Sequence, residues 1–88
     1  MNALPGGDLV ERGLEDLREG RESIEALLVS IGARRLRAAG IDVPAALADP
    51  ELRLYRELAK REGDGAHSAY NALIRRLVGF ERALECGT

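Results

Sequence analysis

The chain has 88 residues, of which 45% are hydrophobic and 32% charged, and its formal net charge at pH 7 is −2. This composition is typical of one small globular domain and is too apolar for a disordered chain. The slight acidic balance excludes a strong bulk attraction to nucleic acid or to an anionic membrane.

The cysteine content and the apolar runs predict the cellular compartment. Cys86 is the single cysteine, which excludes an internal disulfide and fits a reducing cytosol. The longest strongly apolar run covers residues 26–33, which is far shorter than the ~18 residues of a membrane span. We therefore expect a cytoplasmic protein without a membrane segment.

The first expected element is a long helix over residues 8–39, preceded by a flexible leader at residues 1–7. Asp8 stands where an N-cap residue is expected, and Gly40 follows the last helical position as a C′ glycine. An apolar face runs along this segment at helical spacing and comprises Val10, Leu14, Leu17, Ile24, Leu28 and Ile31.

Gly13 and Gly20 interrupt this helix and lie on one face, because they are seven residues apart. Each costs ~1 kcal/mol relative to alanine in a helix interior. Two interpretations stand side by side: the glycines let another backbone approach closely, or the helix bends or breaks near Gly20. Gly32 adds weight to the bend.

A second helix is expected at residues 50–62. Asp49, Pro50 and Glu51 have the types expected of an N-cap, an N1 proline and a first-turn acid. Residues 44–48, just before it, have the composition of one short helical turn. The residues expected to face inward are Leu52, Tyr55, Leu58 and Ala59.

The third helix is expected at residues 65–86, after Gly63-Asp64-Gly65, in which Asp64 is the expected N-cap. Its apolar residues recur in steps of three and four, as in a heptad repeat, and Ile74 and Val78 lie beside that seam. The seam comprises Ala66, Tyr70, Leu73, Leu77, Phe80 and Leu84.

These elements predict an all-α fold, a small up-down bundle of three helices. At ~1.5 Å per residue, the second helix spans ~20 Å and cannot cover a first helix of ~48 Å. Uncovered apolar stripes are rare in monomers, so either the first helix breaks near Gly20 and folds back, or a second copy covers the stripes in a homodimer. We expect the homodimer, with a helix interface that comprises Leu17, Ile24, Leu28, Ile31, Tyr70, Leu73, Leu77, Phe80 and Leu84.

One polar row on the third helix is a candidate site: His67, Asn71 and Arg75 follow one another at intervals of four residues. In a ligand or anion site, Arg75 would clamp the anion and His67 would act as acid or base. A solvated face opposite the core is the favoured interpretation. No catalytic arrangement is found, and one histidine with one cysteine predicts neither a metal nor a cofactor.

Arginines gather near the end of the first helix and on the third helix. In the three-helix arrangement both groups reach a similar height, so they are expected to form a basic patch able to contact phosphates. The acidic balance, the scarcity of aromatic residues and the simpler macrodipole explanation weigh against nucleic acid. The patch comprises Arg34, Arg35, Arg37, Arg75, Arg76 and Arg82.

The favoured function is therefore non-enzymatic: a protein–protein interaction or oligomerisation module whose apolar stripe binds a second copy of the chain or a partner helix. The alternative is a nucleic-acid-associated or anion-binding protein that uses the arginine patch.

Overall fold

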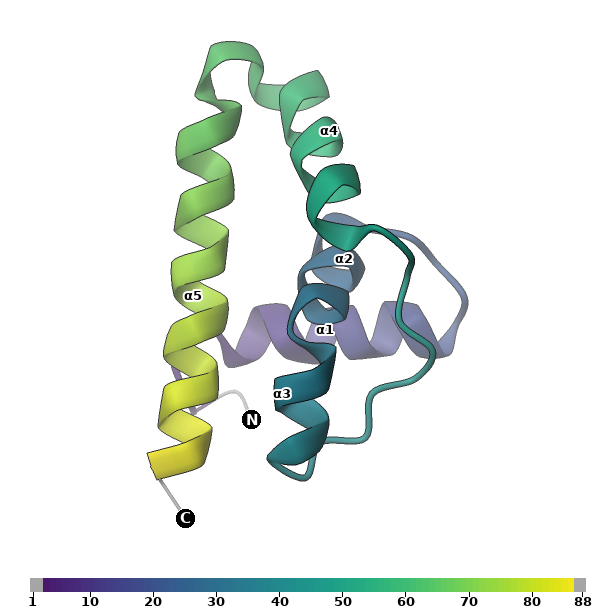
Figure 1. The fold of residues 1–88 in the computed structure, drawn as a ribbon, viewed down its shortest axis with the longest axis vertical. Coiled ribbons are helices and arrows are strands. Elements are labelled where there is room, and N and C mark those ends of the chain that lie inside the picture. The colour runs from purple at the N-terminus through teal and green to yellow at the C-terminus, as the bar shows by residue number, and fades with distance from the viewer. Residues whose placement is uncertain (1–2, 87–88) are drawn as a thin grey trace.

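The computed structural model describes residues 3–86, and these residues form helices and turns without a strand. In Figure 1, α5 runs along one side of the molecule, α4 and the α2–α3 pair line the other side, and α1 crosses behind them. The predicted all-α class is confirmed, whereas the division into helices differs. The elements are α1 (Gly7–Arg18), α2 (Ile24–Ile31), α3 (Ala33–Ala38), α4 (Pro50–Glu62), a 3-10 turn (Gly63–Gly65) and α5 (Ala66–Cys86).

The continuous helix predicted at residues 8–39 is wrong, because the chain breaks after Arg18 and again at Gly32. Gly20 has a φ of 74°, which a glycine adopts without the strain that a Cβ atom would add. Ser23 then caps α2, since its Oγ accepts a hydrogen bond of 3.0 Å from the Ala26 amide. The break near Gly20, one of the two alternatives that the sequence left open, is thus the one found here.

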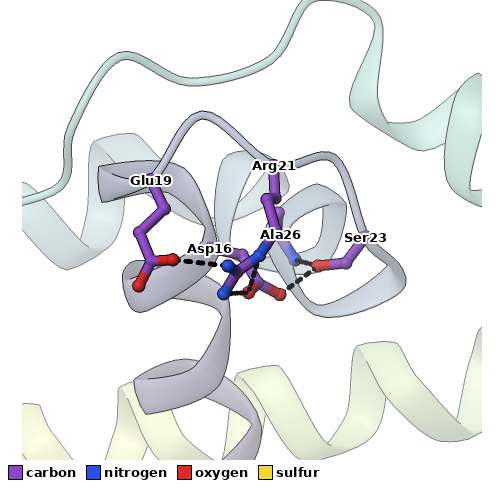
Figure 2. A network of polar contacts seen from close by, with 5 residues as sticks. All are labelled: Asp16, Glu19, Arg21, Ser23 and Ala26. Carbon is purple, nitrogen blue, oxygen red and sulfur yellow. Dashed lines mark hydrogen bonds and ion pairs between the residues drawn. The ribbon is translucent and has the colours of Figure 1, made fainter.

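The turn between α1 and α2 is held by a polar network around Asp16, whose five residues Figure 2 shows. Asp16 is buried and accepts hydrogen bonds from Ser23 Oγ at 2.6 Å and from Arg21 Nη2 at 2.8 Å. Arg21 also pairs with Glu19. The hydrogen bond from Ser23, and then the one from Arg21, holds the pKa of Asp16 below its usual value.

Replacing Asp16 with asparagine is expected to destabilise the fold at pH 7, because asparagine lacks the charge that Arg21 and Ser23 stabilise. The pKa of Asp16 is lower in the folded chain than in the unfolded chain. The contribution of Asp16 to the free energy of unfolding is therefore complete above its pKa in the unfolded chain. It is lost as the pH falls through its pKa in the folded chain. Urea denaturation should show a constant difference between wild type and variant near neutral pH, and a smaller one below about pH 4.

The control for this prediction is Glu15→Gln, which removes a carboxylate from an exposed position of the same helix. It is expected to leave the urea midpoint nearly unchanged across the same pH range. Equal midpoints for Asp16→Asn and wild type at pH 7 would contradict a structural role for the network.

Gly13 allows the backbones of α1 and α2 to approach closely, which was the other interpretation of the glycines in this segment. A Cβ atom on Gly13 would lie 2.4 Å from the Glu25 carbonyl oxygen and 2.5 Å from Val29 Cγ2. The absence of a side chain therefore lets α1 and α2 cross in direct contact. The two interpretations of the glycines are both correct, each for a different residue.

The start of α1 corrects a second prediction, because Asp8 is not its N-cap. The helix begins at Gly7 with Gly6 in the N-cap position. Asp8 instead accepts a hydrogen bond of 3.1 Å from Arg76 Nη2, which ties α1 to α5. Within the predicted leader, residues 3–6 form a turn, and Leu4 packs against the core.

The end of α3 agrees with the predicted glycine stop. Gly40 has a φ of 95°, and the Ile41 amide donates a 3.0 Å hydrogen bond to the Leu36 carbonyl. This is the hydrogen-bond pattern of a Schellman motif. No helical turn forms at residues 44–48, so that prediction is wrong; Arg37 instead donates hydrogen bonds to the Val43 and Pro44 carbonyls.

Helix α4 begins and ends where the sequence predicts, although Asp49 does not cap it through its side chain. Its predicted inward face is largely wrong. Leu54 and Leu58 are buried, whereas Leu52 is 53% and Tyr55 40% exposed. Ala59 is also exposed. Because α2 folds back, α4 packs against both α2 and α5, and Leu54 and Leu58 are its buried side chains.

The homodimer was predicted because a short middle helix would leave apolar stripes uncovered. Since the first segment folds back, α1 and α2 cover each other, and Val10, Leu14 and Leu28 are at most 1% exposed within one chain. Phe80 of α5 is fully buried as well. The premise of the dimer argument is thus wrong, and the homodimer stays a prediction without that premise.

The helices of residues 3–86 were also compared with the requirements of a bilayer span. None of them has both the length and the hydropathy to cross a membrane.

Candidate functional site

An open apolar groove lies between the α2–α3 pair and α5, where Figure 1 shows the two sides of the molecule facing each other. Its volume is about 530 Å³. The residues that line it are Ile31, Gly32, Arg34, Arg35 and Ala38 on one side and Ile74, Leu77, Val78 and Glu81 on the other.

The groove exists because α2 meets α5 closely at its floor. A Cβ atom on Gly32 would lie 2.7 Å from Glu81 Oε2 and 3.1 Å from Leu77 Cδ1, so a larger residue there would require these two side chains to shift. Gly32 and Leu77 are buried, whereas Ile31 and Val78 are half-buried. The walls of the groove therefore present apolar side chains that α2, α3 and α5 cover only in part.

Arg35 joins α3 to the C-terminal part of α5 by ion pairs. It donates to Glu81 at 3.2 Å and to Glu85 at 2.8 and 2.9 Å. The pKa of Glu81 is raised because burial removes water from its carboxylate, an effect that Arg35 opposes only in part. The hydrogen bond from Arg35 holds the pKa of the exposed Glu85 carboxylate below its usual value. Arg35 thus neutralises a carboxylate at the edge of an apolar groove.

Aromatic side chains continue the apolar surface from the groove towards α4. The rings of Tyr55 and Tyr70 lie with their centroids 6.0 Å apart at an interplanar angle of 58°. Tyr70 stands one helical turn before Ile74, and burial raises its pKa. The exposed Leu52 lies three residues before Tyr55, on the same side of α4.

The predicted polar row on α5 is only partly assembled. His67 is exposed, and its Nε2 lies 3.2 Å from Nδ2 of Asn71. Arg75 lies a further turn along the helix, and its side chain forms no hydrogen bond or ion pair with other residues of the described range 3–86. None of the three residues of the row lines the groove.

The predicted arginine patch is divided, because three of its six members bind groups of the same chain. Arg35 pairs with two glutamates, Arg37 binds backbone carbonyls and Arg76 pairs with Asp8. Arg82 lies close enough to Glu85 to help lower the pKa of that carboxylate. Arg34 and Arg75 are exposed and make no side-chain ion pair within residues 3–86.

The nine residues predicted as a helix interface belong to the core of a single chain or pack against it. Four of them are buried: Leu17, Leu28, Leu77 and Phe80. The others are half-buried and pack against that core: Ile24, Ile31, Tyr70, Leu73 and Leu84. Ile31 and Leu77 also line the groove.

Two residues of the groove, the buried Glu81 and Gly32, were not predicted as part of a site. Glu81 stands four residues after Leu77, and this shared helical face is the signal that could have marked it as buried. The role of Gly32 depends on residues nearly fifty positions away, so no local signal could have identified it.

Within residues 3–86, no group of three or more His, Cys, Asp or Glu side chains is arranged to hold a metal ion. Comparisons with protein-family models, with curated proteins and with solved structures find no match to this chain.

Proposed function

We propose that this chain is a non-enzymatic protein–protein interaction module that takes up an amphipathic helix in the groove between α2–α3 and α5. The observation that supports this most strongly is the groove itself. It is open to solvent, and Ile31, Ile74 and Val78 on its two walls are only half-buried. Apolar side chains on both walls, Ile31 and Ala38 opposite Ile74, Leu77 and Val78, suit a helix that presents apolar residues at spacings of three and four.

An interaction module also agrees with the chemistry of the remaining polar groups. Two of the three charged residues that line the groove, Arg35 and Glu81, are engaged with each other. His67 is exposed, and neither it nor Asn71 lines the groove. Binding through apolar contact requires no group with catalytic reactivity.

The proposal is tested with a designed helical peptide that has leucines on one face and uncharged glutamines on its flanks. Amide NMR spectra should show shifts at Ile31, Ala38, Ile74 and Val78 when the peptide is added. Val78→Asp should weaken binding at least about ten-fold, because a carboxylate would be buried against leucine. Ala38→Asp, at an exposed position of the groove edge, should weaken it without risk to the fold.

The control is Ala72→Asp, which adds the same charge to α5 at an exposed position outside the groove. It should leave the peptide affinity unchanged within about two-fold. Peptide binding that survives both groove substitutions, or shifts confined to other surfaces, would overturn the proposal.

The second candidate is an anion-binding or nucleic-acid-associated protein. Exposed Arg34 and Arg75, without an ion pair in the described range, favour it. Against it stands the use of Arg35, Arg37 and Arg76 within the chain. Binding of mixed nucleic acid at about 20–50 mM salt, with no binding of the peptide, would promote this candidate.

A further inference from the structure

We infer that the helix bound in the groove carries acidic side chains along the two flanks of its apolar face. This inference rests on the proposed function and adds the chemistry of the partner. Arg34 and Arg35 line the groove from α3, and Glu81 is the one acid in its lining. Arg75 and Arg82 lie three residues before and four residues after Val78 on α5, so they stand beside this wall of the groove. The charged residues of the lining thus have a net charge of +1, whereas the whole chain carries −2.

Two exposed arginines without an ion pair in the described range, Arg34 and Arg75, lie on opposite sides of the groove. Arg34 lines it from α3 and is exposed. Arg75 is not itself part of the lining, but it is exposed and lies three residues before Val78, so it stands beside the α5 wall. Neither pairs with an acid within residues 3–86. A helix lying between them would bring its two flanks within reach of both guanidinium groups, which bind carboxylates through charge-assisted hydrogen bonds.

The same charges argue against a dimer in which the grooves of two copies face each other. In such a symmetric dimer, Arg34, Arg75 and Arg82 would lie near the arginines of an equally basic rim. Like charges placed together across an interface disfavour association. A partner of a different sequence, with glutamate or aspartate beside its apolar residues, matches the rim without this repulsion.

The test uses three labelled helical peptides that share one leucine face and differ only in their flanks: glutamate, glutamine or lysine. Fluorescence anisotropy should give the glutamate peptide a Kd at least about five-fold lower than that of the glutamine peptide, and the lysine peptide the highest Kd. The preference should shrink as the salt concentration rises from about 20 mM to about 0.5 M, because exposed charges are screened.

Substitutions connect this preference to the rim. The double variant Arg34→Glu/Arg75→Glu should bind the lysine peptide more tightly than the glutamate peptide. The control Arg18→Glu/Arg56→Glu has the same net charge. It changes two exposed arginines on α1 and α4, helices that do not line the groove. It should keep the preference of the wild type. If the double variant does not fold, Arg75→Glu alone should reduce the preference at least about two-fold.

The outcomes separate this inference from the function on which it rests. Equal Kd values for the three peptides, with amide shifts in the groove, would overturn the acidic partner and leave the interaction module standing. No binding of any peptide would overturn both. Sedimentation at twice the chain mass that Val78→Asp reduces to one chain mass would identify a second copy as the occupant and overturn the inference.

Discussion

Replacing Gly13 with alanine is expected to lower the free energy of unfolding by at least about 2 kcal/mol. The added Cβ atom would lie 2.4 Å from the Glu25 carbonyl oxygen and 2.9 Å from its carbonyl carbon. These are backbone atoms of α2, which cannot rotate away as a flexible side chain can. The two helices would have to separate, and apolar contacts between α1 and α2 would be lost along their crossing.

This result would be opposite in sign to the effect expected from helix propensity. Alanine is favoured over glycine by ~1 kcal/mol in a helix interior, so the local effect alone would stabilise α1. Gly79→Ala is the matched control, because Gly79 lies within α5 and nothing is within 4 Å of its ideal Cβ position. It should stabilise the protein by up to about 1 kcal/mol.

Urea denaturation of both variants measures the contrast directly. A Gly13→Ala protein as stable as the wild type would show that α1 and α2 do not cross at the distance described. Destabilisation by both substitutions to the same extent would attribute the effect to glycine removal in general rather than to the crossing.

Replacing Phe80 with alanine is expected to lower the free energy of unfolding by about 3–5 kcal/mol. Phe80 is 0% exposed and is the largest of the fully buried side chains. It lies on the face of α5 that meets the turn before α1, where its Cβ is 3.5 Å from the ideal Cβ position of Gly6. A chain of this length is stabilised by only about 4–13 kcal/mol in total, so this loss is a large share of its stability.

Two further substitutions define the scale for this prediction. Phe80→Leu keeps most of the apolar volume and should cost less than about 2 kcal/mol. Leu52→Ala removes a side chain that is 53% exposed and should cost no more than about 0.5 kcal/mol. Thermal unfolding followed by circular dichroism gives the order of the three variants. A Phe80→Ala midpoint close to that of Leu52→Ala would place Phe80 outside the core.

Features that depend on neighbouring residues along the chain could be predicted from the sequence. The start of α4 follows from Pro50, whose fixed φ suits the first turn of a helix, and its end follows from Gly63, with a φ of 56°. The stop at Gly40 is read in the same way. Each of these signals acts over a few residues, so it does not depend on the rest of the fold.

The candidate site was predicted only in part, because it depends on contacts between residues far apart in the sequence. Ile74 and Val78 were placed on the apolar face of α5, and both line the groove. Which helix faces them depends on the path of residues 19–40. The side chains that complete the site, among them Ala38 and Glu81, take their role from a contact between α3 and α5 that has no local sequence signal.

The sequence by itself determined the helical class, the positions of α4 and α5 and the residues able to stop a helix, because local backbone preferences and hydrophobic periodicity decide these features. Only the tertiary structure decided that the first segment divides at Gly20 and Gly32. Residues 26–30 are buried in succession on all sides of α2, which requires neighbours around the whole helix. A straight helix over residues 8–39 cannot provide those neighbours. The chain therefore folds back, and Leu54 of α4 is buried in the resulting core. The face of α5 that carries Ile74 and Val78 is left partly uncovered and forms one wall of the groove.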